Sequence, residues 1–168
     1  MQLLLVRHGI AEDQAEFAKT KQDDSLRPLT KEGRWKMESA ARGLRRAVPA
    51  VEVLATSPLL RSVQTAKIIA DRYRGIEPIT VPSLAPDAGF ESFLNWLRKQ
   101  RAAPTIAAVG HEPHLGGLAT WLLTGSPESK IPLRKGGACL IEFDALPTAG
   151  GGVLLWALTP SLLRRISD

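Results

Sequence analysis

The stretch LLLVRHGIAE, residues 3–12, begins as an apolar run and then changes character abruptly. Its apolar residues lead directly into Arg7, His8 and Gly9. A short apolar run bounded by polar residues is typical of a buried strand. Because the chain contains only 3 histidines, an imidazole placed directly after this strand makes the end of the strand a candidate site.

Outside this stretch, the composition predicts one soluble globular domain spanning residues 1–168. Of the 168 residues, 44% are hydrophobic and 23% are charged, which suits an ordinary folded domain. Cys139 is the single cysteine, so no internal disulfide can form, and we interpret it as a small core residue. The sequence shows no basic leader and no apolar run long enough for a bilayer, so we expect a cytoplasmic protein without membrane contact.

The formal net charge is +5 and the sequence pI is about 9.7. The cations are spread along the chain and aromatic residues make up only 5%. Nucleic-acid binding would require basic residues clustered with aromatic ones, so we do not expect a nucleic-acid partner. The charge instead favours a mild attraction for small anions such as phosphate.

Short apolar runs alternate with longer segments of helical periodicity, which predicts an α/β fold with a mostly parallel central sheet and helices on both faces. Ser57 and Pro58 suit the N-cap and first residue of one helix. Residues 9–29 are polar and irregular, and too long for an ordinary connection, so we expect a functional loop there. The expected strands are 2–6, 51–56, 79–81, 105–110, 138–143 and 153–158, and the expected helices are 31–48, 58–73, 90–101, 113–123 and 161–168.

Three of the expected strands end in residues that can bind phosphate. The first is followed by Arg7-His8-Gly9, the second by SPLLR at 57–61, and a later one by GHEP at 110–113. Ligands of open parallel sheets bind outside the carboxyl ends of the strands. If these strands are neighbours, His8, His111, Arg7 and Arg61 share one pocket.

That set of residues fits phosphoryl chemistry. The planar fork of arginine matches phosphate oxygens, and a helix N-terminus beside Arg61 adds free N–H groups. Gly9 is expected to let the backbone pass close to a bound phosphate. A neutral imidazole can attack phosphorus and carry the phosphoryl group covalently, while fixed cations stabilise the charge that develops.

The motifs RHG (7–9), SPLLRSVQTA (57–66) and GHEP (110–113) resemble the histidine phosphatase superfamily, which has the phosphoglycerate-mutase-like fold. The resemblance covers nearly the whole chain. The short length and the segment RPLTKEG (27–33) are similar to the small SixA-type phosphohistidine phosphatases.

The resemblance implies specific roles. His8 matches the nucleophile that becomes phosphohistidine, and His111 matches the second histidine, which binds phosphoryl oxygens. Arg7 and Arg61 match the phosphate-binding arginines, and Arg27 matches a further pocket arginine. One strand of the sheet should be antiparallel.

The sequence departs from larger family members in its general acid. Those members have a glutamate after the third strand, where this chain reads VPSLAPDAGFE (81–91). Asp87, Glu91 and Glu112 are candidates, and Glu12 could substitute. A phosphohistidine substrate leaves as an easily protonated imidazole and needs less help from an acid than an alkoxide does. The missing glutamate therefore favours a P–N substrate over a sugar phosphate.

From these residues we expect a metal-independent phosphatase that needs no cofactor and acts in signal transduction. Its expected substrate is a phosphorylated protein, such as a histidine-containing phosphotransfer domain, and inorganic phosphate should also bind. The alternatives are a small-molecule phosphomonoesterase and a regulatory module that binds a phosphoprotein without turnover. HEPH (111–114) invites a metal site, but Pro113 separates the histidines and no second cluster supplies ligands. His114 is therefore expected outside the first contacts of the phosphate.

Overall fold

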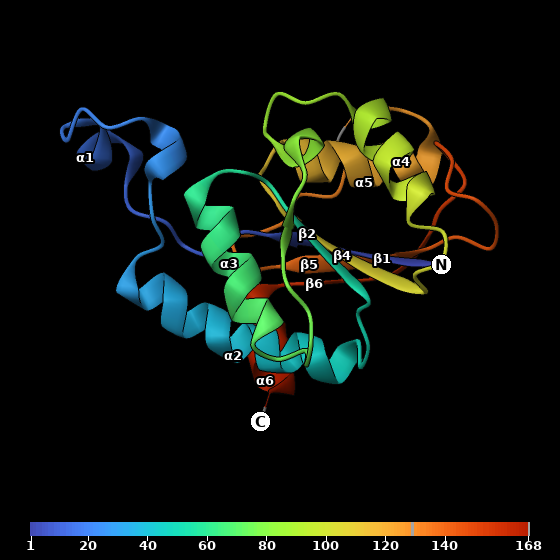
Figure 1. Cartoon of the computed structure of the whole chain (residues 1–168), viewed down its shortest axis with the longest axis horizontal. Helices are drawn as coiled ribbons and strands as arrows, with labels where there is room; N and C mark the ends of the chain where they lie inside the picture. Colours follow the sequence, from blue (N-terminus) through green and yellow to red (C-terminus); the bar gives the residue numbers. More distant parts are fainter. Residues whose placement is uncertain (129, 168) are drawn as a thin grey trace.

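The computed structural model describes residues 1–128 and 130–167, which form a six-stranded sheet in the order β3-β2-β4-β1-β5-β6 (Figure 1). Strand β5 runs antiparallel to both of its neighbours, whereas the pairings of β1 with β4, β4 with β2 and β2 with β3 are parallel. The expectation of a mostly parallel sheet with one antiparallel strand is thus confirmed. The strands are β1 (Gln2–Arg7), β2 (Val53–Thr56), β3 (Ile79–Thr80), β4 (Thr105–Gly110), β5 (Ala138–Glu142) and β6 (Val153–Leu158).

Helices cover both faces of the sheet, as expected. Helices α2, α3 and α6 lie on one face, and α4 and α5 lie on the other (Figure 1). No helix within the described residues is long and apolar enough to span a bilayer. The helices are α1 (Gln14–Ala18), α2 (Lys31–Ala47), α3 (Leu60–Ala70), α4 (Phe90–Lys99), α5 (His114–Thr124) and α6 (Pro160–Ile166), with 3₁₀ turns η1 (Asp24–Leu26) and η2 (Pro82–Leu84).

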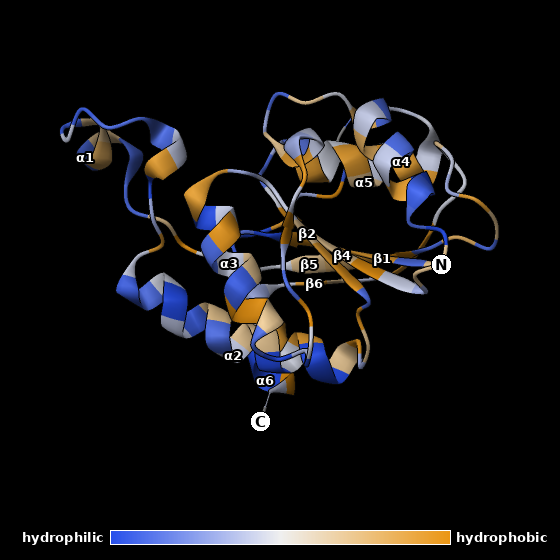
Figure 2. Cartoon of the chain, viewed as in Figure 1, coloured by the Kyte–Doolittle hydropathy of each residue, from blue (hydrophilic) through white to orange (hydrophobic). Residues whose placement is uncertain are grey.

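Strand β1 is the centre of the core because both of its faces are buried. Leu3 and Leu5 pack towards α4 and α5, whereas Leu4 and Val6 pack towards α2, α3 and α6. Burying each such side chain stabilises the fold by about 1.5–3 kcal/mol. Figure 2 shows the result as apolar strands between helices whose outward faces are polar. The apolar run of the opening stretch therefore fixes β1 in the middle of the sheet.

The register of the parallel strands brings the predicted strand ends together. Arg7 of β1 pairs with Gly110 of β4, and Thr56 of β2 pairs with Val109 of β4. The residues that follow, His8, Ser57 and His111, consequently emerge at the same edge of the sheet. This arrangement confirms the expected convergence of the strand ends.

Three local expectations need correction. The segment 9–29 is not irregular throughout: it contains α1, capped by the Asp13 side chain, and η1, capped by that of Asp23. Ser57 is not a helix N-cap, because α3 begins at Leu60 and Leu59 occupies the cap position. The C-terminal helix α6 begins after Thr159, whose side chain caps it, and the predicted last helical residue, Asp168, lies outside the described residues.

Candidate active site

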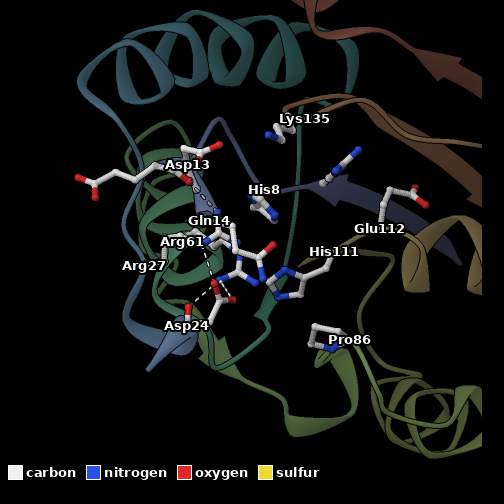
Figure 3. Close-up of a pocket in the computed structure, with 13 residues that line it drawn as sticks. His8, Asp13, Gln14, Asp24, Arg27, Arg61, Pro86, His111, Glu112 and Lys135 are labelled. Carbon is white, nitrogen blue, oxygen red and sulfur yellow. Dashed lines mark hydrogen bonds and ion pairs between the residues drawn. The ribbon is translucent and has the colours of Figure 1, made fainter. Parts of the chain in front are cut away.

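A cavity of about 600 Å³ opens at the carboxyl ends of β1, β2 and β4 (Figure 3). It brings together the candidates from the three strand ends, and Arg27 reaches it from the segment that follows η1. Its lining comprises Arg7, His8, Ala11, Glu12, Asp13, Gln14, Asp24, Arg27, Arg61, Pro86, His111, Glu112 and Lys135.

His8 is oriented by the backbone of its own neighbour. Its Nδ1 lies 2.7 Å from the carbonyl oxygen of Gly9. A carbonyl only accepts hydrogen bonds, so Nδ1 carries the proton and the lone pair of the neutral ring resides on Nε2. The side chain is buried, with the residue only 6% exposed. The structure therefore holds His8 in the tautomer whose Nε2 can act as a nucleophile.

The surroundings of His8 also keep its ring neutral. Burial lowers the pKa of His8 to about 4, and the charges of Arg61, Arg7 and Lys135 act in the same direction. A lowered pKa preserves the uncharged imidazole, which is the form able to attack phosphorus. The sequence analysis did not single out Lys135. The structure places it in the pocket lining, in the loop before β5.

His111 lies beside His8, with 5.0 Å between the ring centroids. Its Nε2 is 2.8 Å from Ser57 Oγ and 3.2 Å from Ser62 Oγ. Burial lowers the pKa of His111 to about 3. Ser57, which precedes the cap residue of α3, thus contacts a site histidine. Ser57 and Ser62 both belong to the motif SPLLRS, and that is the sequence signal that could have identified them.

The arginines are held by acceptors on distant parts of the chain. Arg7 Nη1 donates to the carbonyl of Leu133 at 2.8 Å, and Arg61 Nη1 donates to the carbonyl of Asp24 at 2.9 Å. The Nε atoms of Arg7 and Arg61 are buried without a hydrogen-bond partner in the described part of the chain. Because a buried unpaired donor costs about 1–3 kcal/mol, these arginines are suited to a bound anion that accepts from them.

Asp24 was not predicted, although its spacing three residues before Arg27 is a detectable signal. Its Oδ1 lies 2.7 Å from Arg27 Nε, and its Oδ2 lies 3.1 Å from Arg61 Nη1. The hydrogen bond from Arg27 holds the pKa of Asp24 below its usual value. Asp24 is therefore a carboxylate in contact with both arginines (Figure 3).

The candidate general acids occupy different places. Asp87 and Glu91 are exposed and lie outside the pocket lining, whereas Glu112 and Glu12 belong to it. Burial raises the pKa of Glu112. Its Oε1 accepts a hydrogen bond from the backbone N–H of Leu133 at 2.8 Å, and its carboxyl group points away from His8 (Figure 3).

Gly9 and His114 both lie outside the pocket lining, which agrees with the expectation for His114 but differs from the expectation that Gly9 brings the backbone close to a bound phosphate. A Cβ built on Gly9 would come 3.4 Å from the carbonyl oxygen of Gly33, which is an ordinary contact with α2. His114 is buried, and its Nε2 is 3.0 Å from the carbonyl of Ala88. Within residues 1–128 and 130–167, no cluster of three or more metal-ligating side chains occurs. Cys139 is buried in β5, and burial raises the pKa of its thiol to about 12.

Thermal stability should fall as the pH drops from about 6.5 towards 4. In the unfolded chain His8 and His111 take up protons near pH 6.5, whereas the pKa is about 4 for His8 and about 3 for His111 in the folded chain. The unfolded state then binds more protons, so the free energy of unfolding decreases with falling pH across this window. Thermal melts of the wild type and of His8→Gln would show it, with a shallower pH slope in the variant. An equal slope in both proteins would contradict the buried neutral state of His8.

A sequence profile of the histidine phosphatase superfamily (branch 1) matches residues 3–86. The chain is 38% identical over 139 residues to an uncharacterized protein of Picosynechococcus sp., covering 82% of each. The chain belongs to the histidine phosphatase superfamily, and this membership implies a phosphatase.

Within the superfamily the chain is SixA-like. It is 29% identical over 168 residues to phosphohistidine phosphatase SixA of Escherichia coli strain K12, covering 98% of this chain and 97% of that one. The solved structure of the protein histidine phosphatase SixA complexed with tungstate superposes with a TM-score of 0.82 at 25% identity, covering 97% of this chain and 99% of the other. Tungstate is an oxyanion of phosphate-like shape, so these neighbours support a substrate that carries phosphate.

Proposed function

We propose that this phosphatase removes the phosphoryl group from phosphohistidine on a protein, through a covalent phosphohistidine at His8. The observation that carries the proposal is the state of His8. Its Nδ1 is hydrogen-bonded to the Gly9 carbonyl. Its Nε2 makes no hydrogen bond to the described residues, and the ring is uncharged at neutral pH in a pocket lined by guanidinium groups. This combination supports nucleophilic catalysis at phosphorus.

In the first step Nε2 of His8 forms a bond to phosphorus while the bond from phosphorus to the leaving nitrogen breaks. The nonbridging oxygens are bound by Arg7, Arg61 and Arg27, and His111 stabilises the charge that develops. The leaving imidazole takes up a proton and departs. In the second step water attacks the phosphorus of phospho-His8, inorganic phosphate forms and His8 recovers its neutral state.

The position of Glu112 supports a P–N substrate. Its carboxyl group is engaged with the Leu133 N–H and points away from His8. An alkoxide leaving group depends on a well-placed proton donor, whereas an imidazole is basic enough to be protonated readily. The similarity to SixA proteins points to the same substrate class.

The proposal predicts faster clearance of a phosphoprotein than of a small ester. Phosphate release should be measured, with EDTA present, from a histidine-phosphorylated phosphotransfer domain and from an alkyl phosphomonoester such as glycerol 3-phosphate, whose alkoxide leaving group needs a proton donor. We expect the phosphoprotein to be dephosphorylated much faster, because its imidazole leaves without a dedicated acid.

Other outcomes have distinct meanings. If only the ester is cleaved, the protein is a small-molecule phosphomonoesterase, and Glu112 becomes the first residue to test as its acid. If neither substrate is cleaved but the phosphoprotein binds, the protein is a phosphoprotein-binding module. Loss of phosphoprotein clearance in EDTA would contradict a metal-independent mechanism.

A further inference from the structure

Residues 11–29, which we call the arm, supply Arg27 to the pocket from outside the main fold. The arm extends beyond α2 and α3, away from the sheet (Figure 1). A bridge between Ala11 and Leu29 closes the arm on itself, and a hydrogen bond from the Leu29 N–H to Gln64 Oε1 at 2.8 Å connects it to α3. Neither contact involves the guanidinium of Arg27. Its Nη1 donates to the Glu12 carbonyl at 2.8 Å, but Glu12 belongs to the arm, so a connection from this guanidinium to the body must come from another residue.

Asp24 makes that connection. Its carboxylate accepts from Arg27 Nε within the arm and pairs with Arg61 Nη1 of α3, which also donates to the Asp24 carbonyl. Among the ion pairs found in residues 1–128 and 130–167, the pair of Asp24 with Arg61 is the one that joins the arm to the body. One side chain thus links two guanidinium groups from different parts of the fold (Figure 3).

The link also offsets a repulsion. Burial lowers the pKa of Arg61, and the neighbouring charge of Arg27 lowers it further, so each cation disfavours the other. A carboxylate between them counteracts this repulsion in the absence of a ligand. Each guanidinium has five N–H donors, and a bond to Asp24 at one edge leaves other donors for a phosphate.

We propose that Asp24 is a positioning residue that joins Arg27 and Arg61 into a single phosphate clamp. The proposal rests on the proposed function only in naming phosphate as the ligand. Asp24 acts through the arginines: it sets their orientation before the anion arrives, which reduces the cost of ordering two long side chains on binding.

Asp24→Asn should weaken phosphate binding. The Asn amide keeps one oxygen acceptor but directs its NH₂ group towards one of the two arginines. The variant therefore loses the simultaneous contact with Arg27 and Arg61 and also the negative charge that offsets their repulsion. Titration calorimetry with inorganic phosphate should show Kd rising on the order of 10-fold, which lies within the range of interaction energies measured between contacting residues. KM for the phosphoprotein should rise by a similar factor, with a smaller change in kcat.

Glu16→Gln is the matched control. It removes one carboxylate from the same arm, at the exposed ion pair with Lys19, without touching either arginine. Phosphate affinity and KM should be unchanged in this variant. An equal loss in Glu16→Gln and Asp24→Asn would overturn the proposal, because the effect would then follow from any perturbation of the arm and not from the contacts of Asp24 with the arginines.

Combining variants separates positioning from a general structural role. If Asp24 acts through the arginines, the loss of phosphate affinity in Asp24→Asn/Arg27→Ala should be smaller than the product of the two single losses, because only the contact of Asp24 with Arg61 remains to be lost in the Arg27→Ala background. Fully multiplicative losses would overturn the proposal, as would tighter phosphate binding by Asp24→Asn, which would mean that the carboxylate competes with the anion. Because the titration needs no turnover, an inactive wild type would refute the proposed function and leave this test intact.

Discussion

Replacing His8 with Ala should abolish turnover, with a loss on the order of 10⁴-fold or more, as expected when a covalent nucleophile is removed. The side chain supplies the Nε2 that bonds to phosphorus in the covalent intermediate. Water cannot replace this nitrogen, because it cannot form a phosphoryl intermediate attached to the protein. The measurement is phosphate release from the phosphoprotein, together with incorporation of labelled phosphate into the protein after rapid acid-free quenching. The wild type should carry base-stable label on a histidine, and His8→Ala should carry none.

The control for this variant is His114→Gln. His114 is also a buried histidine, but it lies outside the pocket lining and bonds to the Ala88 carbonyl. We expect His114→Gln to retain label on His8. Thermal melts should show that His8→Ala is folded, since its ring contributes one hydrogen bond, to the adjacent Gly9. Undiminished label in His8→Ala would refute the covalent role of this residue.

Replacing Arg61 with Ala should lower kcat/KM by about 10²- to 10³-fold, the usual cost of losing a donor that stabilises transition-state charge in a buried site. The Arg61 side chain is almost fully buried, and its Nε has no partner among the described residues, so a bound phosphoryl group is its natural acceptor. Steady-state kinetics on the phosphoprotein would measure the loss.

Arg61→Lys distinguishes charge from geometry. Lysine retains a cation but lacks the planar fork that binds two oxygens at once. We therefore expect Arg61→Lys to recover only part of the activity lost in Arg61→Ala. Arg98→Ala serves as a control, because Arg98 lies on α4 outside the pocket lining and bonds to the Pro147 carbonyl. Full activity of Arg61→Lys would show that charge alone is needed.

The core of this site could be read from local patterns. An apolar run that ends in Arg7 and His8, and another that ends before His111, identify buried strands and the residues at their carboxyl ends. Because parallel strands present these ends at one edge, the sequence predicted that His8, Arg61 and His111 converge if their strands are neighbours, and the observed order β2-β4-β1 meets that condition. Short-range information was sufficient for this part of the prediction.

Contacts between distant segments could not be read in the same way. Arg61 reaches Asp24 across a sequence separation of 37 residues, and Arg7 reaches the Leu133 carbonyl across 126. No period or motif relates such positions, because loops bring them together only when the sheet and helices have packed. The two short helical turns within 9–29 were missed for a related reason, since they contribute few residues to the core.

The amino-acid sequence by itself determined the strands, the fold class, and the histidines and arginines at the strand ends, because hydrophobic periodicity and residue chemistry are local properties. Only the tertiary structure decided that the Gly9 carbonyl selects the tautomer of His8, that Glu112 is engaged with Leu133, and that Asp24 links Arg27 to Arg61. Hydrogen-bond direction and charge pairing depend on distances of a few ångströms, and those distances exist only in the folded chain.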